Sequence, residues 1–246
     1  MAKFLRVQRF REKEAVMDRS ELWNTVGSID SVYCGSGVDG KGLRCVVFFS
    51  GCNLRCPFCH NPETLFKGGE QIRAGELAER LMKYKPYFRR GGVTLSGGEP
   101  FLQKKFLLSL VDLLHAQGIH VLAETNGQIA DGEILSVLDG VIVDIKNQEG
   151  EDLSVYRRFI GKCGRHNISV QATCVLVPGK NDTPAKIAEL ARLLKNIPFR
   201  FLPFRKLCAE KYKNLGLVFP YAGIEECDEN TLKNADNIYK SVVFDK

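Results

Sequence analysis

The residues best suited to chemistry are three closely spaced cysteines, Cys52, Cys56 and Cys59, in a C-x3-C-x2-C pattern. They follow an apolar run at residues 46–49, so they fall in a loop whose backbone can curl around one inorganic centre. A structural zinc site closes its tetrahedron with four protein ligands, and simple iron–sulfur clusters also usually take four cysteines. Three thiolates would leave one iron of a four-iron cluster open. The pattern therefore predicts a [4Fe-4S] cluster that can bind a substrate at that iron.

A zinc site is the alternative for the same residues, with His60 as the fourth ligand, and it would make the chain a zinc-binding interaction module. Adjacent Cys59 and His60 would have difficulty reaching one ion together, and no second spaced pair of cysteines or histidines exists. A disulfide within the motif is disfavoured, because the N-terminus does not resemble a secretory signal. The remaining cysteines lack ligand spacing and are predicted to be small buried residues: Cys34, Cys45, Cys163, Cys174, Cys208 and Cys227.

The elements that must position this loop can be predicted from residue 44 onward, where strand patterns alternate with helical ones. Such alternation indicates parallel strands joined by covering helices. The cysteine loop follows the C-terminal end of the first such strand, which is where α/β barrels hold their active sites. We predict a partial (β/α)6 barrel over residues 28–246, after an N-terminal extension at residues 1–27. Residues 28–42 are expected to form an irregular loop, and residues 241–244 a closing edge strand.

Two segments resemble a known family. Residues 52–61, which end in Cys-His-Asn, and the later Ser96-Gly97-Gly98-Glu99 segment resemble the radical S-adenosylmethionine superfamily, and among its members the pyruvate formate-lyase activating enzymes. The resemblance covers roughly residue 28 to the C-terminus. It implies S-adenosylmethionine at the open iron, its reductive cleavage, and removal of a hydrogen atom from a backbone glycine of a glycyl-radical enzyme, with pyruvate formate-lyase as the leading candidate partner. No general acid or base is needed, and the chemistry is anaerobic.

The same resemblance implies which residues contact the cofactor. Phe58 and the backbone at His60 would flank the adenine, while the strand-end glycines Gly97 and Gly98 admit the ligand and Glu99 receives its ammonium group. Asp144 and Lys146 lie two apart on a predicted strand and face the same way, so they form either an ion pair or a cofactor contact. The remaining expected contacts are Cys59, Thr125, Ile145 and Arg205 with the cofactor, and Asp39 with the protein substrate.

Four positions depart from the family pattern. Lys41 stands where the family usually has proline, Thr173 where it often has arginine, and Arg205 where it has histidine. Glu124 replaces an aspartate near a bound monovalent cation, so the cation is an open expectation for this chain. A radical enzyme that acts on a small molecule, such as a queuosine-pathway synthase, is the enzymatic alternative.

Composition excludes some classes of partner. The net charge of +6, from 35 basic and 29 acidic residues, is too mild for a nucleic-acid binder. It is compatible with an acidic electron donor such as flavodoxin or ferredoxin. No apolar run approaches the roughly 18 residues that cross a membrane. The expected location is cytoplasmic.

Overall fold

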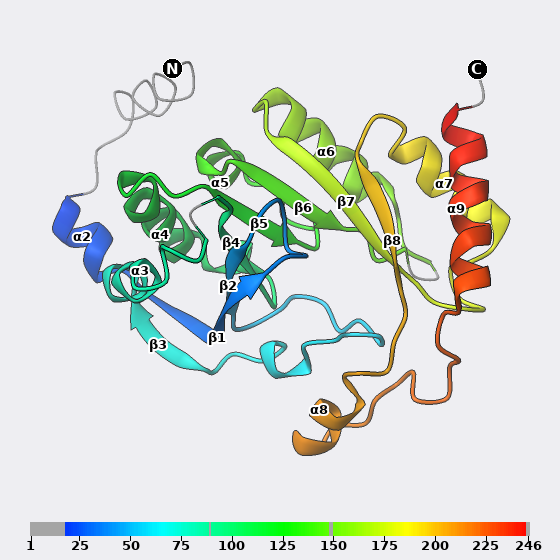
Figure 1. The fold of residues 1–246 in the computed structure, drawn as a ribbon, viewed down its shortest axis with the longest axis horizontal. Coiled ribbons are helices and arrows are strands. Elements are labelled where there is room, and N and C mark those ends of the chain that lie inside the picture. The colour runs from blue at the N-terminus through cyan, green and yellow to red at the C-terminus, as the bar shows by residue number, and fades with distance from the viewer. Residues whose placement is uncertain (1–17, 89, 148–149, 245–246) are drawn as a thin grey trace.

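A sheet of eight strands, in the order β3-β1-β2-β4-β5-β6-β7-β8, organises this computed structural model, which describes residues 18–88, 90–147 and 150–244 (Figure 1). Six neighbouring strands pair in parallel and in sequence order, as predicted for a (β/α)6 barrel. The two end strands of the sheet do not pair with each other, so the barrel is partial. The six strands are β2 (Arg44–Phe49), β4 (Gly92–Gly97), β5 (Val121–Thr125), β6 (Gly140–Asp144), β7 (Ser169–Leu176) and β8 (Phe199–Pro203).

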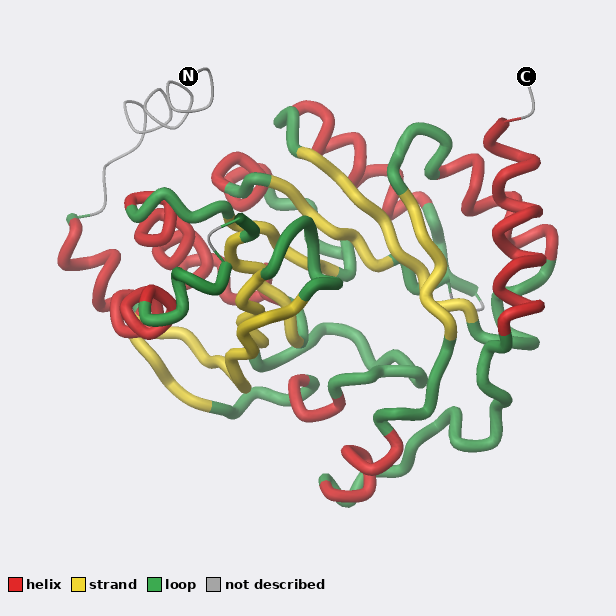
Figure 2. The backbone as a smooth tube through the Cα atoms, viewed as in Figure 1, coloured by secondary structure: helices red, strands yellow, loops and turns green. Residues whose placement is uncertain are grey.

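Apart from the short helix at residues 209–214, which lies beside the cysteine loop, most of the helices lie outside the sheet (Figure 2). Their apolar faces bury one continuous core against it, which fixes the curvature of the barrel and leaves the strand ends free to carry a site. Thr183 caps α7 through a hydrogen bond from the Lys186 amide, and Pro184 follows it, as the sequence indicates. The helices are α3 (Ala74–Met82), α4 (Lys104–Ala116), α5 (Gly132–Val137), α6 (Ser154–Arg165), α7 (Pro184–Leu193), α8 (Ala209–Asn214) and α9 (Glu229–Phe244), with 3-10 turns η1 (Pro62–Thr64) and η2 (Pro100–Gln103).

The segment before β2 is only in part the irregular loop that we predicted, because residues 37–42 are irregular but residues 28–36 belong to a strand. Strand β1 (Val26–Ser36) pairs antiparallel with β2 and, over its first residues, with β3 (Glu70–Arg73). The glycines suggested a loop, but cross-strand pairing overrides local preference. Helix α2 (Arg19–Asn24) packs on α3, where Trp23 occupies the space that a side chain at Gly75 would need. β1 therefore spans the expected domain boundary after residue 27; residues 1–17 lie outside the described part.

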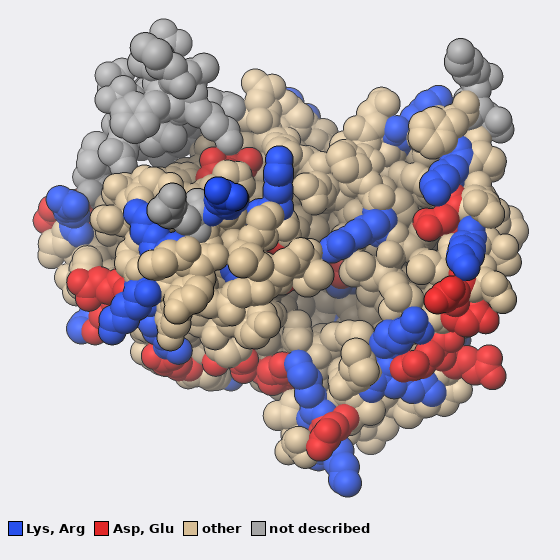
Figure 3. All heavy atoms as spheres, viewed as in Figure 1, with Lys and Arg blue, Asp and Glu red and all other residues tan. Residues whose placement is uncertain are grey.

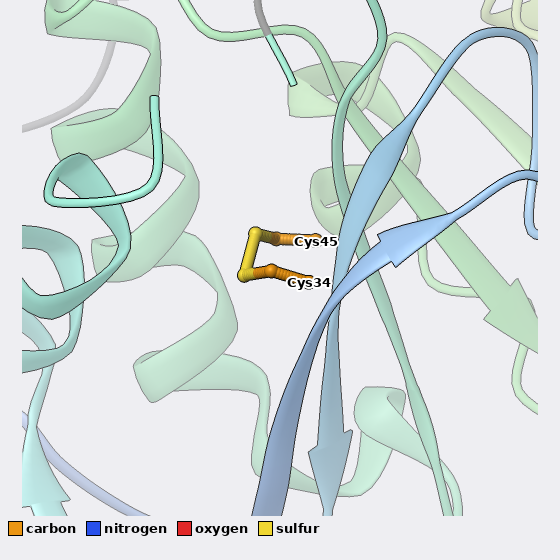
Figure 4. Close-up of a disulfide and its surroundings, with 2 residues drawn as sticks. All are labelled: Cys34 and Cys45. Atoms are coloured by element: carbon orange, nitrogen blue, oxygen red, sulfur yellow. A yellow bond between two sulfur atoms is a disulfide. The ribbon is translucent and has the colours of Figure 1, made fainter. Parts of the chain in front are cut away.

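Two further predictions are wrong. Residues 241–244 form the last turn of α9, because that helix packs along α7 and Tyr239 stacks on Phe199 with ring centroids 4.6 Å apart. Cys34 and Cys45 are joined by a disulfide rather than being separate buried thiols (Figure 4). The spacing of these two cysteines gives no sign of the bond, since only the β1–β2 register places them opposite each other.

The loop at residues 37–43 closes the end of the barrel opposite the cysteine loop. Arg44, only 1% exposed, donates from Nε to Thr94 Oγ1 at 2.6 Å, and Thr94 donates to the Asp39 carbonyl at 2.7 Å. Burial lowers the pKa of Arg44 to about 10. From β8, Arg200 Nη2 donates to the Val38 carbonyl at 2.9 Å. These hydrogen bonds hold residues 37–43, which we call the floor, across the end of the barrel opposite the cysteine loop. They also connect β8 to the loop that follows β1.

Among the described residues, the longest apolar helices still fall short of what a membrane span requires.

Candidate functional site

A cavity of about 200 Å³ lies at the C-terminal ends of the parallel strands, as predicted. All three motif cysteines line it, together with residues at the ends of the neighbouring strands. In the space-filling view, this face of the molecule is hollowed between the β1–β2 hairpin and β8, above the cysteine loop (Figure 3). The remaining predicted residues that line the cavity are Phe58, His60, Gly97, Gly98, Thr125, Asp144 and Lys146.

Backbone hydrogen bonds hold the cysteine loop against the end of β4. The Gly51 amide donates to the Thr64 carbonyl at 2.8 Å, and the Glu99 amide donates to the Gly51 carbonyl at 2.8 Å. A Cβ at Gly98 would lie 2.1 Å from the Gly51 oxygen, and one at Gly97 would lie 2.3 Å from the Phe49 nitrogen. The two glycines therefore let two backbone segments pack directly together, a role additional to the ligand approach that the sequence suggested.

The thiols occupy an apolar setting with one polar support. Burial raises the pKa of Cys56 to about 11 and also raises that of Cys59. Thiolates are therefore disfavoured at this site in the absence of a nearby positive charge. Bound metal would provide that charge. Asn126 donates from Nδ2 to Asn53 Oδ1 at 2.8 Å and to Cys52 Sγ at 3.9 Å. The turn after β5 thus helps to position one cysteine and the residue beside it.

The arrangement fits a cluster held by three thiolates better than it fits a single metal ion. His60, the suggested fourth zinc ligand, has Nε2 on the Arg205 carbonyl at 2.8 Å. Within residues 18–88, 90–147 and 150–244, no three His, Cys, Asp or Glu side chains are grouped closely enough to hold one ion. A tetrahedral zinc site requires such grouping, because its ligands all lie about 2 Å from the metal.

Asp144 and Lys146 form an ion pair at the cavity wall, with 2.5 Å between Oδ2 and Nζ. Burial opposes the charge on Lys146, but the Asp144 carboxylate outweighs it and raises the Lys146 pKa above its ordinary value. The ammonium also lies 5.9 Å from the centre of the Phe58 ring. Thr173, at the position where the family often has arginine, donates to Asp144 Oδ1 at 3.2 Å. The pair leaves a fixed cation and a fixed anion facing the cavity.

Glu99 and Glu124 differ in their position relative to the cavity. Glu99 is fully buried and accepts hydrogen bonds from Thr125 Oγ1 at 2.9 Å and from the Asn126 amide at 2.8 Å, so its carboxylate orients the end of β5. Glu124 lines the cavity and accepts from Ser96 Oγ at 2.6 Å. Burial raises the pKa of Glu124 to about 7, and the charge of Asp39 contributes.

Four predicted contact residues are not among those that line the cavity: Asp39, Glu99, Ile145 and Arg205. Asp39 belongs to the loop that closes the opposite end, and Ile145 is fully buried in the core. The Arg205 guanidinium donates to the Cys227 carbonyl. Sequence reasoning missed Asn126, which lines the cavity and directly follows the predicted contact Thr125.

The segment after β8 folds over the outer side of the cysteine loop. Lys211, on α8, donates to the His60 carbonyl and to Asn61 Oδ1, both at 3.1 Å, and pairs with Glu63 Oε1 at 2.6 Å. This segment therefore braces the residues that follow Cys59 and limits the directions from which the cavity can be reached.

Comparisons with known proteins agree with this geometry. A family model described as a 4Fe-4S single cluster domain matches residues 38–156. The chain is 37% identical over 238 residues to a pyruvate formate-lyase-activating enzyme of Clostridium pasteurianum, with 89% of this chain and 99% of that protein covered. It is 34% identical to one of Staphylococcus epidermidis, with 89% and 96% covered. Among solved structures, QueE from Escherichia coli matches 82% of this chain and 97% of its own, with a TM-score of 0.55 and 16% identity.

Proposed function

Because this chain belongs to the family of pyruvate formate-lyase-activating enzymes, which are radical S-adenosylmethionine enzymes, we propose that it activates a glycyl-radical enzyme, with pyruvate formate-lyase as the first candidate. As a member, it is an enzyme that uses a [4Fe-4S] cluster and S-adenosylmethionine. The fold is the partial barrel of that superfamily. The target would be a backbone glycine of the partner.

One observation carries the proposal: three thiols line a single cavity, and the candidate fourth protein ligand, His60, bonds elsewhere. Cys52, Cys56 and Cys59 would hold the cluster and leave one iron for the cofactor. When bound, the cluster supplies the electron that cleaves S-adenosylmethionine and so starts hydrogen abstraction. The protein's contribution is to bind, orient and shield, since no acid or base is required.

The residues around the thiols divide the remaining tasks. Lys146 and Asp144 present opposite charges to a cofactor that has both carboxylate and ammonium groups. Phe58, 4% exposed, provides an apolar surface for a purine ring. Gly97 and Thr125 border the same space. Glu99 acts behind Thr125 and is a positioning residue.

The proposed partners follow from access to the cavity. An open barrel can admit a loop of another protein, and an acidic donor such as flavodoxin or ferredoxin would reduce the cluster in the cytoplasm. A monovalent cation near Glu124 and Asp144 is proposed as well, because these carboxylates border one cavity. The small-molecule alternative gains no support from the relatives above 30% identity, which have activating-enzyme names.

The test is electron paramagnetic resonance on the anaerobically reconstituted, reduced chain, with and without S-adenosylmethionine and then with pyruvate formate-lyase. We expect a cluster signal that changes on cofactor addition, 5′-deoxyadenosine in the same sample, and a glycyl radical on the partner. Cofactor cleavage without a glycyl radical would point to another substrate. Bound zinc without a cluster signal would overturn the proposal.

A further inference from the structure

We propose that the outer edge of β1, from Ser31 to Cys34, binds an extended segment of the protein substrate by main-chain strand pairing. This inference rests on the proposed function, because it concerns how the glycine-bearing segment reaches the cavity. We call residues 31–34 the open edge.

The open edge has a strand on one side only. β3 pairs with β1 from Val26 to Ile29, whereas β2 pairs with it from Ile29 to Ser36. Among the described residues, no strand lies along the other side of β1 beyond Ile29. Register irregularities between Ile29 and Ser31 and between Cys34 and Ser36 bound the edge at both ends. Such bulges interrupt an exposed edge and so limit indiscriminate pairing, which leaves room for one short segment.

The cross-strand geometry identifies the free main-chain groups. Cys34 and Cys45 lie opposite each other, with their Cα atoms 4.0 Å apart. In antiparallel sheets this distance is about 4.5 Å for a non-hydrogen-bonded pair and about 5.5 Å for a hydrogen-bonded pair, so Cys34 and Cys45 form a non-hydrogen-bonded pair. Bonded and non-bonded pairs alternate, so the Val32 and Val47 pair is also non-bonded. The N–H and C=O groups of Val32 and Cys34 therefore point away from β2. None has a hydrogen bond to a turn or loop in the described part of the chain.

The open edge runs from the floor at residues 37–43 toward the strand end that leads into the cysteine loop. Just beyond its end nearer the cysteine loop, Ile29 pairs with Phe49, the last residue of β2 before that loop. At the opposite end, the bond from Arg200 to the Val38 carbonyl brings β8, the other end strand of the sheet, next to the loop that follows β1. The hollow in Figure 3 lies between these two edges. A segment paired with residues 31–34 would advance about 3.3 Å per residue along this edge toward Ile29, where β3 occupies the same edge, so its continuation would have to turn into the hollow.

Main-chain pairing suits a glycine target because glycine offers no side chain to recognise. Strand addition draws its affinity from main-chain hydrogen bonds. Tyr33 is 59% exposed and pairs with Val46. Val46 is buried, but it does not belong to the core cluster that contains its neighbours Cys45 and Val47. Tyr33 therefore lies on the inner face of the sheet, where its ring can cover a glycine on a neighbouring strand. These features favour an extended, glycine-containing protein segment as the occupant.

Hydrogen–deuterium exchange on the reconstituted full chain, with and without saturating pyruvate formate-lyase, tests the proposal amide by amide. We expect the Val32 and Cys34 amides to exchange at least tenfold more slowly in the complex. The Tyr33 amide, already bonded to β2, is the internal control and should change little. Unchanged Val32 and Cys34 exchange in the complex would overturn the proposal. If the Val32 and Cys34 amides already exchange as slowly as the Tyr33 amide in the free chain, the edge is covered without a partner, and the proposal is overturned.

A pair of variants gives a second test. Val32→Pro removes the outward N–H, while Val32→Ala removes the same side chain and keeps that group. Proline is tolerated on an edge strand where its nitrogen faces outward. We expect at least tenfold weaker binding of pyruvate formate-lyase by Val32→Pro than by Val32→Ala, and the reduced-cluster spectrum would report whether each variant is folded. Equal affinities of two folded variants would contradict the pairing. A glycyl radical formed by the wild-type chain without edge protection would leave the proposed function intact and reject this inference alone.

Discussion

At the scale of residues, the cavity opposes the ionisation that its cysteines need. Burial raises the pKa of Cys56 to about 11, so a free thiolate is costly at neutral pH. Lys146 is the nearby cation, and it is already paired with Asp144. Cluster assembly must therefore supply the positive charge that stabilises the thiolates, and each thiol should be indispensable.

The first prediction concerns Cys56→Ala. Loss of one of three ligands should abolish cluster assembly and cofactor cleavage together. Iron and sulfide content and 5′-deoxyadenosine formation would measure both. Cys163→Ala is the matched control, because Cys163 is also buried but lies on α6 and does not line the cavity, so this variant should keep the cluster. A Cys56→Ala chain with full cleavage would contradict the ligand assignment.

The second prediction concerns Glu124, whose pKa is raised to about 7. A carboxyl whose pKa is higher in the folded state than in the unfolded state stabilises the folded protein while it is protonated. This contribution is fully present below the unfolded-state pKa, and it is lost as the pH rises through the folded-state pKa. Between pH 5 and 8 the loss should reach up to about 3 kcal/mol. Glu124→Gln cannot ionise and should lose less stability over this range. Urea unfolding of the cluster-free protein at both pH values would measure it; parallel pH dependence in the two proteins would refute the environment described for Glu124.

At the scale of elements, the glycines after β4 determine how two segments meet. Gly98 permits contact with Gly51 of the cysteine loop, and the neighbouring Glu99 supports the end of β5 through Thr125. The cysteine loop is therefore positioned by the ends of β4 and β5, the two strands that follow β2 in the sheet. A change at either strand end should alter how the loop holds the cluster.

The third prediction is that Gly98→Ala displaces the cysteine loop. The added Cβ would lie 2.1 Å from the Gly51 oxygen, so backbone must move. We expect a loss of about 2 kcal/mol or more in the free energy of unfolding, and a lower cluster content after reconstitution. Gly37→Ala is the control, because a Cβ there meets nothing within 4 Å. Equal stability and equal iron content in the two variants would argue against close packing at Gly98.

At the scale of the whole molecule, β1 extends the barrel beyond its six parallel strands. Its disulfide from Cys34 to Cys45 connects this end of the sheet to the strand that leads into the cysteine loop. The floor at residues 37–43 lies within the loop that the disulfide closes, so it restrains the floor as well as the open edge.

The fourth prediction is that reduction of this disulfide destabilises the fold. Closing a loop of 11 residues should contribute about 3 kcal/mol by restricting the unfolded chain. Urea unfolding with and without a phosphine reductant would measure the difference, and a Cys34→Ser variant should be insensitive to reductant. If the wild-type protein is equally insensitive, the bond does not contribute to stability.

The sequence by itself determined the features that depend on local pattern. The thiol spacing indicated a three-ligand centre, the alternation of strands and helices indicated the parallel barrel, and the two-residue spacing of Asp144 and Lys146 placed them on one face. Each signal is local, because ligand spacing and side-chain alternation act within a few residues.

The tertiary structure decided which polar groups have partners far along the chain. It turned Glu99 toward Thr125, Arg205 toward Cys227, and Asn126 toward the cysteine loop. It also paired β1 with β2, which joined Cys34 to Cys45 and left one edge of β1 open at residues 31–34. These outcomes depend on register and curvature across the sheet, and both are set by packing of the whole core rather than by any one segment.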